Sequence, residues 1–320
     1  MERIDNDSTK EKIKVYAAAI IYSGSVGFSF YGIKMCVPYG DTLTILSFRY
    51  MWALIGAIVW IAVCIPLGFY SFPKEKHPKK NLYLTAGFYV LFMILQIFAM
   101  FFATSIEGAI VFAAVPIVAK LIARIFLGEK STALQNVFVG ITVSALLLMI
   151  VLNATDTEMS LPGIIIMFLA SVCLAISNVF MRYVRGAFKP IEITLTISVM
   201  GFVVFNCANV IRHIKEGTMD QYFEPFTHPQ FTIWIIYLGI FCILLSAQFV
   251  AYMMSKLPVI QTTIWGNVST AISILAGALL LGEPLQWFHI LCAILIIGGV
   301  IGLSVAPPPK DYESKSMMDE

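Results

Sequence analysis

Charged residues are scarce in this sequence, and their scarcity excludes most classes of soluble protein. Asp, Glu, Lys and Arg together make up 12% of the 320 residues, whereas 59% are hydrophobic. Soluble domains carry about 25% charged residues and about 45–50% apolar ones. A disordered chain would be more polar, and a nucleic-acid-binding domain would need a basic face. The composition therefore predicts an integral membrane protein whose solvent is the lipid bilayer.

Paired cysteines and catalytic motifs are also missing. The six cysteines lie singly in or beside apolar stretches, so we expect small core residues rather than disulfides or a metal site. No HExxH, GxSxG, GxGxxG or phosphate-binding loop motif occurs, and the four histidines lie in loops or near a membrane surface. We predict that the protein is not an enzyme and has no catalytic residue, metal or cofactor.

Ten apolar stretches divide the chain. As α-helices with a rise of about 1.5 Å per residue, stretches of about 20 residues can cross a hydrocarbon core of about 30 Å. Barrel strands would instead alternate apolar with polar residues. We therefore predict an all-α membrane protein with ten transmembrane helices. The predicted spans are Val15–Met35, Thr42–Ile65, Leu82–Ala103, Glu107–Leu127, Leu134–Leu152, Leu161–Val184, Ile191–Ile211, Phe231–Met254, Val259–Leu281 and Leu285–Val305.

The placement of lysine and arginine predicts the orientation. Fifteen of the eighteen basic residues outside the predicted spans fall on one side when the N-terminus is placed inside. Because cytoplasmic segments carry the excess of positive charge, both termini are expected in the cytoplasm, with the plasma membrane as the expected location. Residues 1–14 form the expected cytoplasmic head, and residues 306–320, which include three consecutive prolines, form an expected disordered tail.

The sequence contains an internal repeat. Residues 105–129 align without a gap on residues 259–283, and both segments end in Leu-Gly-Glu before another apolar span. The chain therefore divides into two five-span halves, residues 15–152 and 161–305. Because each half has an odd number of spans, the halves are inverted relative to each other. Secondary transporters use this plan, with a binding site near the membrane midplane between the halves.

Two motifs carry a resemblance to a known family. They are FAAVPIVAKLIARIFLGEK in the first half and STAISILAGALLLGEPLQWFHILCAILIIGGVIG in the second. Over residues 13–305, the sequence resembles the EamA-like family of the drug/metabolite transporter superfamily. The resemblance implies ten helices around a central cavity, alternating access, and export or exchange of amino acids, related metabolites or drugs. Thr270 in place of a second Pro116, and the charges of Lys120 and Arg124, depart from the family pattern.

The repeated Leu-Gly-Glu motif is expected to be structural. Its glycines suit the left-handed residue that ends a helix, and the residues that follow suit the start of the next one. We expect a tight helical hairpin at each membrane surface, with a role in transport as the alternative. The motif residues are Gly128, Glu129, Gly282 and Glu283.

Three basic residues lie inside predicted spans. Arg49 is seven residues into the second span, at a depth of about 10 Å. An arginine in hydrocarbon costs at least about 2.5–3.5 kcal/mol, so Arg49 should face the bundle interior, as an ion pair or as an anchor for a substrate carboxylate. Lys120 lies similarly deep, as a cavity cation or a snorkelling one, beside Pro116, which is able to kink its helix. Arg124 is expected to snorkel.

Other polar residues complete the predicted site. Glu107 begins the fourth span, where a carboxylate suits a helix N-terminus, and it is alternatively the candidate for proton coupling. Amides and aromatic walls would suit an amphipathic zwitterion, although helix packing is the competing interpretation. The predicted cavity-lining residues are Gln96, Gln248, Tyr252, Trp265 and Asn267.

The leading hypothesis is a secondary transporter that exports or exchanges small organic metabolites, with amino acids or their derivatives as first candidates. One alternative is an exchanger of anionic phosphorylated or sugar-linked metabolites. Another, from a different class, is an integral-membrane enzyme or a channel. The expected partners are a small-molecule substrate, the lipid bilayer and protons, with no nucleic acid, and the protein is expected to act as a monomer or a homodimer.

Overall fold

The computed structural model describes residues 2–68, 78–127, 132–155, 161–184, 187–256 and 259–307. Every regular element within these ranges is a helix. The first part of the chain forms α1 (Glu2–Gly27), α2 (Ser29–Cys36), η1 (Val37–Tyr39), α3 (Thr42–Cys64), α4 (Lys80–Ala99), α5 (Ser105–Ala113), α6 (Val115–Leu127) and α7 (Ala133–Thr155). The second part forms α8 (Leu161–Val184), α9 (Pro190–Glu216), η2 (Met219–Gln221), η3 (Glu224–Thr227), α10 (Pro229–Gly239), η4 (Ile240–Leu245), α11 (Ser246–Lys256), α12 (Val259–Leu280) and α13 (Trp287–Val305).

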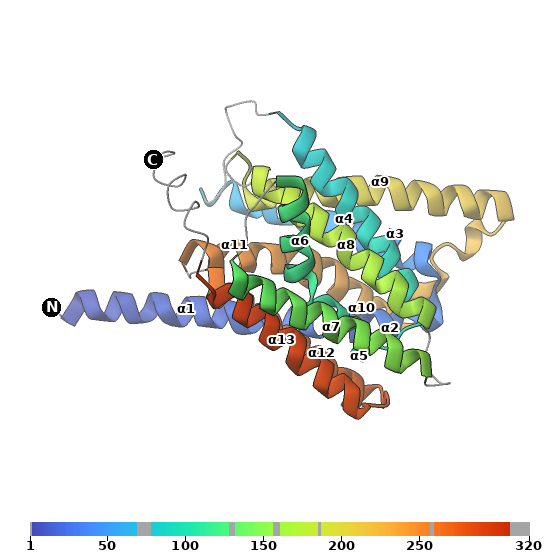
Figure 1. Ribbon diagram of the computed structural model, residues 1–320. Helices are drawn as coiled ribbons and strands as arrows, with labels where there is room; N and C mark the ends of the chain where they lie inside the picture. The colour runs from blue at the N-terminus through green and yellow to red at the C-terminus, as the bar shows by residue number, and fades with distance from the viewer. Residues whose placement is uncertain are drawn as a thin grey trace.

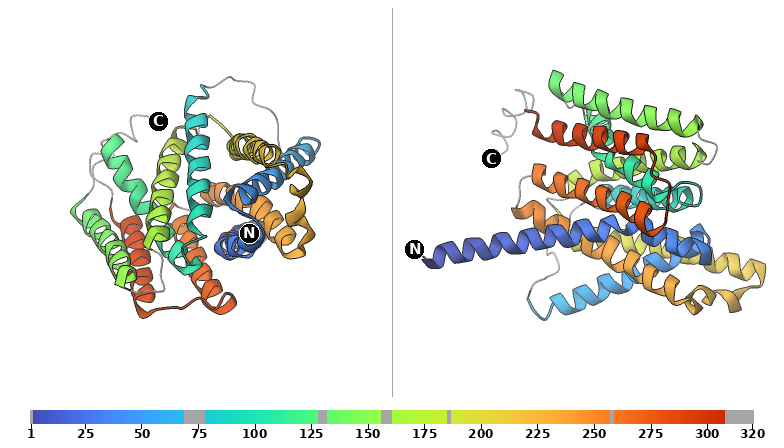
Figure 2. Two further views of the ribbon diagram at one scale, coloured as in Figure 1. Left: turned by 90° about the vertical axis from the view of Figure 1, so that its right-hand side faces the viewer. Right: turned by 90° about the horizontal axis from the view of Figure 1, so that it is seen from below.

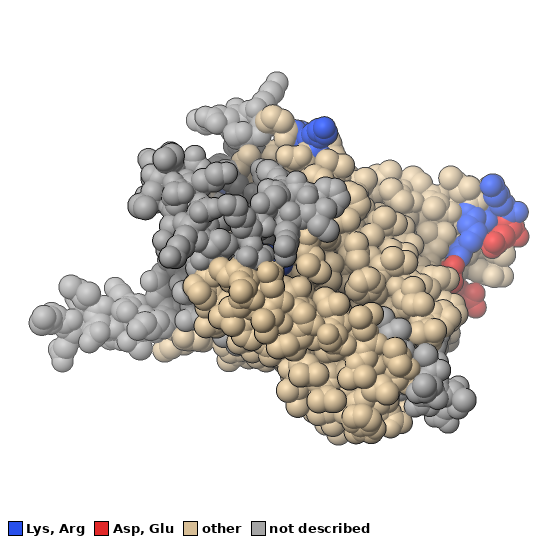
Figure 3. Space-filling view, in the orientation of Figure 1, with Lys and Arg blue, Asp and Glu red and all other residues tan. Residues whose placement is uncertain are grey.

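The long helices run along one common direction and form a bundle (Figures 1 and 2). The helix α1 begins, and α13 ends, at the same end of this bundle (Figure 1). Because α1 starts at Glu2, residues ahead of the first predicted span belong to the same helix. On the face shown in Figure 3, charged side chains gather at the start of α4 and over the far end of α9, with a broad uncharged surface between them. Most of the predicted tail lies outside the described residues.

Within the described residues, seven helical segments are long and apolar enough to cross a membrane, and three shorter apolar helices accompany them. The prediction of an all-helical, multi-pass membrane protein is therefore confirmed, and each predicted span overlaps one of these ten segments. The seven long segments are Ile13–Tyr39, Thr42–Cys64, Lys80–Ala99, Ser105–Ile122, Leu161–Met181, Pro190–Glu216 and Pro229–Val250. The three shorter ones are Ala133–Met149, Trp265–Leu280 and Trp287–Leu303.

Three of the long segments are interrupted: the segment Ile13–Tyr39 at Phe28, between α1 and α2, and two others as follows. The helices α5 and α6 meet at Ala114, whose amide bonds to the carbonyl of Val111 rather than continuing the regular ladder. Pro116 lacks an N–H and cannot continue that ladder, so the kink expected from its position is present. Between α10 and α11, η4 is a π-helix over Ile240–Leu245. Such segments frequently occur at functional sites.

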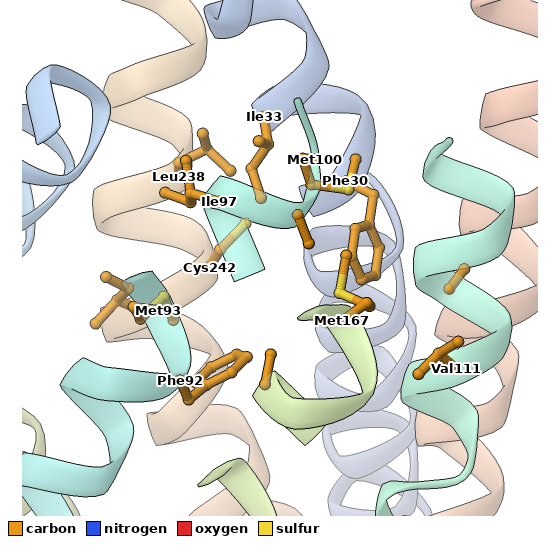
Figure 4. Close-up of a cluster of buried hydrophobic side chains, with 14 of the residues drawn as sticks. Phe30, Ile33, Phe92, Met93, Ile97, Met100, Val111, Met167, Leu238 and Cys242 are labelled. Atoms are coloured by element: carbon orange, nitrogen blue, oxygen red, sulfur yellow. The ribbon is translucent and has the colours of Figure 1, made fainter. Parts of the chain in front are cut away.

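The two parts of the chain pack extensively on each other. The helix α1 packs against α11 and α12, and α8 packs against α4 and α6. The helix α3 packs against α9 and α10, α4 packs against α9, and α7 packs against α13. One apolar core therefore joins both parts of the chain. Figure 4 shows part of this core, where five different elements and the turn after α4 contribute Phe30, Ile33, Phe92, Met93, Ile97, Met100, Met167, Leu238 and Cys242.

A glycine allows α3 and α10 to touch beside Arg49. A Cβ atom on Gly239, the last residue of α10, would lie 2.7 Å from the Arg49 carbonyl oxygen and 3.0 Å from the Ala53 amide nitrogen. Backbone atoms cannot move aside as a flexible side chain can. Close helix approach in membranes relies on small residues of this kind.

Replacement of Gly239 by alanine should therefore destabilise the protein by about 1–3 kcal/mol, because the added methyl group forces the two helices apart. The measurement is the thermal unfolding midpoint of the detergent-purified protein. Gly140→Ala is the matched control, since Gly140 is also helical but has nothing within 4 Å of an added Cβ. An unchanged midpoint for Gly239→Ala would contradict the close contact.

Candidate functional site

Arg49 is a buried cation without a hydrogen-bond or ion-pair partner among the described residues. It lies on α3 with 2% of its surface exposed. Its Nε and Nη1 atoms are buried and make no hydrogen bond, and no carboxylate in the described part of the chain forms an ion pair with it. A charge that is buried and left unpaired is strongly destabilising. The guanidinium therefore offers two N–H donors, in a fixed planar geometry, to a group from outside the protein.

The groups around Arg49 are phenols and thiols. Its charge acts on the side chains of Cys36, Tyr50, Tyr89 and Cys242. These residues belong to α2, α3, α4 and η4, so side chains of four elements lie within electrostatic reach of the guanidinium. Phenols and thiols ordinarily titrate near pH 10 and 8.5 and carry no charge at neutral pH. They can hydrogen-bond to a ligand but do not neutralise Arg49.

Three phenol hydroxyls of this region make no hydrogen bond within the described part of the chain. Tyr22 on α1 and Tyr89 on α4 are half-buried. Neither of their hydroxyls bonds to a described residue, and the buried hydroxyl of Tyr50 also lacks a partner. Tyr50 and Tyr89 were not among the residues selected from the sequence. Tyr89 lies seven residues, or two helical turns, before Gln96, and this spacing could have indicated a shared face.

The predicted amides are buried, and they lie on different helices from Arg49. Gln96 on α4 and Asn267 on α12 are 4% and 7% exposed, and Gln248 on α11 is half-buried. The Gln96 Oε1, Gln248 Nε2 and Asn267 Nδ2 atoms are buried without a partner. No hydrogen bond joins any of these three side chains to Arg49. They are polar groups in the bundle interior, available to a ligand or to water.

The remaining predicted lining residues occupy other surroundings. Lys120 is half-buried on α6, beyond the break at Ala114, and α6 packs against α8 and α13. Tyr252 is half-buried on α11. The ring of Trp265 lies against Tyr16 with centroids 6.4 Å apart, and its backbone carbonyl accepts a hydrogen bond of 2.8 Å from Ser23 Oγ. The side chain of Arg124 lies outside the described residues.

The second Leu-Gly-Glu motif makes a contact that the sequence did not predict. Gly282 adopts a left-handed conformation with φ of 65°, and the Glu283 amide donates to the Gly277 carbonyl at 3.1 Å. The Glu283 carboxylate then accepts hydrogen bonds from the Ser105 amide, the Ser105 hydroxyl and the Ile106 amide, at 2.8, 2.6 and 3.1 Å. Glu283 thus caps α5 in the other half of the chain. Gly128 and Glu129 lie outside the described residues.

Glu107 completes the same helix N-terminus. It forms a capping box with Thr104: its carboxylate accepts from the Thr104 amide at 2.7 Å, and its own amide donates to Thr104 Oγ1 at 3.1 Å. Its side chain is 1% exposed, and its second oxygen, Oε1, is buried without a partner. Lys34 at the end of α2 is within electrostatic reach of both Glu107 and Glu283. Proton coupling by Glu107 remains a prediction.

An ion-pair network holds the start of the helix that carries Arg49. Arg212 on α9 pairs with Asp41, and its Nη2 atom donates to Thr44 Oγ1 at 3.0 Å and to Asn209 Oδ1 at 2.6 Å. Asp41 also caps α3 by accepting from the Thr44 amide at 3.0 Å. Although partial burial alone would raise the pKa of Asp41, its hydrogen bonds with Thr44 and the Arg212 guanidinium lower that pKa below its ordinary value.

The described residues form no metal-binding cluster at the site. Among the described residues, no three His, Cys, Asp or Glu side chains come together in a way that could hold a metal ion. Its chemistry is therefore that of a single guanidinium, neutral hydroxyls and thiols, and amides. Such a set recognises a ligand through charge and hydrogen bonds.

Comparison with known proteins is consistent with this description. The family model for the EamA-like transporter family matches residues 161–305. An uncharacterized transporter of Bacillus subtilis (strain 168), YcxC, is 31% identical over 301 residues, which cover 92% of this chain and 94% of that protein. A crystal structure of another protein is similar with a TM-score of 0.56 at 16% identity, covering 92% of this chain and 95% of that one. At this identity, the likeness establishes a shared fold alone.

The lowered pKa of Asp41 predicts a pH-dependent contribution to stability. Because the pKa is lower in the folded state, the ion pair stabilises the fold fully above the ordinary pKa of about 3.9, and this stabilisation is lost as the pH falls through the folded value. The unfolding midpoint of Asp41→Asn should therefore lie below that of the wild type at pH 5–7, and the difference should shrink towards pH 3. Asparagine retains the helix cap, so the comparison isolates the charge. A difference that is the same at both ends of this range would contradict the assignment.

Proposed function

Because the chain belongs to the EamA-like transporter family of the drug/metabolite transporter superfamily, it is a membrane transporter of small molecules, and we propose that it exports or exchanges amino acids or their derivatives. The observation that carries this proposal is the unpaired guanidinium of Arg49, buried among uncharged groups. A carboxylate that docks there would receive two charge-assisted hydrogen bonds and remove an uncompensated charge from the bundle.

The proposed architecture has ten transmembrane helices in two inverted repeats, residues 15–152 and 161–305, around a central cavity. The packing supports this arrangement. In the proposed repeats, each span of the first repeat corresponds to the span five positions later. Under this correspondence, the contact of α1 with α11 matches that of α8 with α4, and the contact of α1 with α12 matches those of α8 with α5 and α6. The contact of α3 with α10 likewise becomes that of α9 with α4, and α3–α9 and α7–α13 map onto themselves. The matched residues 161–305 coincide with the proposed second repeat.

The charge at the site favours a carboxylate over a phosphorylated metabolite. Arg49 is the cation whose charge acts on Tyr50 and Tyr89, whereas Lys120 lies on α6 in different surroundings. A phosphate monoester carries about −1.5 to −2 charge at neutral pH and would call for more than one cation. One guanidinium matches the single negative charge of a carboxylate.

The remaining groups suit the other end of an amino acid. Phenol oxygens accept hydrogen bonds as well as donate them, so the unengaged hydroxyls of Tyr22 and Tyr50 can receive an α-ammonium group. The aromatic faces add an attraction for the same cation. No carboxylate is then needed to bind a zwitterion, and none lies beside Arg49 within the described part of the chain.

We propose that both termini are cytoplasmic and that the protein lies in the plasma membrane. The beginning of α1 and the end of α13 at one end of the bundle support the first point (Figure 1), as does the excess of lysine and arginine at that end. The transport mode is alternating access of one site, driven or balanced by an ion or a counter-substrate. Glu107 is the candidate proton-coupling residue.

Counterflow in proteoliposomes tests the proposal. A panel of amino acids, together with a phosphorylated metabolite of similar size, is assayed at two pH values. We expect exchange of at least one amino acid and a loss of roughly tenfold or more in Arg49→Ala, because two charge-assisted hydrogen bonds disappear. Arg49→Lys should retain part of the exchange, since it keeps the charge but loses the planar fork.

Three results would count against parts of this account. If no amino acid exchanges while the phosphorylated metabolite does, the substrate class is wrong. A single-channel current or chemical turnover of a lipid would contradict secondary transport altogether. Exchange that does not respond to pH in the wild type would remove Glu107 as the coupling residue without affecting Arg49.

The hydroxyl of Tyr89 should also contribute to binding. Tyr89→Phe is expected to raise the substrate concentration for half-maximal counterflow roughly threefold to tenfold, because one neutral hydrogen bond is lost. Tyr83→Phe on the same helix is the matched control, since Tyr83 is exposed on the bundle surface. Equal values for the two variants would place Tyr89 outside the binding site.

A further inference from the structure

The contact of Glu283 with α5 joins the two proposed repeats at one end of the bundle. Glu283 follows α12 in the second repeat, whereas Ser105 and Ile106 begin α5 in the first repeat. The helices α5 and α12 pack on each other and occupy equivalent positions in the two repeats. We call this end, at which α2 and α12 end and α5 begins, the outer end, because the proposed topology places it outside the cell.

The contact between Glu283 and the start of α5 consists of several directed hydrogen bonds. One carboxylate accepts three hydrogen bonds, two of them from backbone amides that would otherwise be unpaired at a helix start. The positive end of the α5 dipole and the charge of Lys34 both favour an anion at this place. These bonds are charge-assisted, so they are stronger than those between neutral groups.

The fit depends on a glycine at a defined position. A Cβ atom on Gly277 would lie 2.5 Å from Ser105 Oγ, 2.7 Å from Glu283 Oε2 and 2.9 Å from Ile106 Cγ1. Any larger residue would enter the space between the carboxylate and its donors. Gly266, on the same helix, has nothing within 4 Å of such an atom. A larger residue at Gly277 would therefore disturb the contact, whereas the same substitution at Gly266 would not and serves as the control.

We propose that Glu283 is a gating residue whose bonds to Ser105 and Ile106 hold the outer end closed. The inference rests on the proposed function, because alternating access requires helices that meet at the outer end to move apart there while the site opens outward. The three bonds join the end of α12 to the start of α5 at that end, and in this proposal they break in that step. The strength of these hydrogen bonds then sets the balance between the outward-open and outward-closed states.

Cys242 reports directly on this balance. Its thiol lies within electrostatic reach of Arg49 and Tyr89, is 8% exposed, and donates to the Ser25 carbonyl at 3.2 Å. In a variant that keeps Cys242 as its single cysteine, the rate of reaction with a membrane-impermeant methanethiosulfonate reagent measures access to the site. The reagent is added from outside to sealed vesicles and, separately, to inverted ones.

We expect Glu283→Gln and Gly277→Ala to increase the rate of Cys242 labelling from outside by roughly tenfold and to decrease the rate from inside. The first variant loses the charge of the hydrogen-bonded carboxylate, and the second places a methyl group between the carboxylate and its donors. Gly266→Ala should label as the parent does. Ser105→Ala, which removes one of the three bonds, should show a smaller change of the same sign. Opposite changes on the two sides distinguish a gate from general loosening, which would raise both rates.

The proposal is overturned if Glu283→Gln and Gly277→Ala fold, as judged by size-exclusion profile, and label like the parent from both sides. It is equally overturned if both rates rise together. The proposed function stands in either case if Arg49→Ala abolishes counterflow. Should Glu283→Gln fail to fold, Gly277→Ala and Ser105→Ala decide the matter, because both retain the carboxylate.

Discussion

The burial of one uncompensated guanidinium is the constraint around which this protein is organised. Other charged side chains in the bundle have protein partners, as in the Asp41–Arg212 pair and the Glu283 cap. Arg49 is 2% exposed and has two buried donors without an acceptor. An unpaired charge in an apolar bundle destabilises the protein. A ligand that supplies the missing negative charge relieves this destabilisation and is bound more tightly as a result. We propose that the site binds an anion, because no carboxylate among the described residues pairs with Arg49.

The surrounding structure keeps Arg49 in this condition. Its helix begins at a capped and ion-paired end, where Asp41 contacts both Thr44 and Arg212. One turn beyond Arg49, α3 touches the last residue of α10, and the absence of a side chain at Gly239 permits this approach. The π-helix that follows carries Cys242 towards the guanidinium. Rigid contacts thus hold α3 on either side of Arg49, while irregular backbone occurs in the span that faces it.

Much of the fold could be predicted from the sequence, and less of the site. The spans were visible because a bilayer demands long apolar helices, and Arg49 was visible because charge is rare within them. Tyr50 and Tyr89 were not selected, since a tyrosine in an apolar span is as often a packing residue, and its unengaged hydroxyl is a property of the folded bundle. The bonds from Ser105 to Glu283 join residues 178 apart in sequence. The repeat showed that the two segments correspond, but only the packing of α5 on α12 shows that they touch.

The account requires that the transported molecule places its negative group on Arg49. An experimental structure with a counterflow-active amino acid bound tests this most directly. The account predicts the carboxylate within hydrogen-bonding distance of the Arg49 Nε and Nη1 atoms, with a phenol of Tyr22, Tyr50 or Tyr89 beside the same molecule. A bound substrate elsewhere in the bundle, with Arg49 paired to a carboxylate of the protein itself, would contradict it.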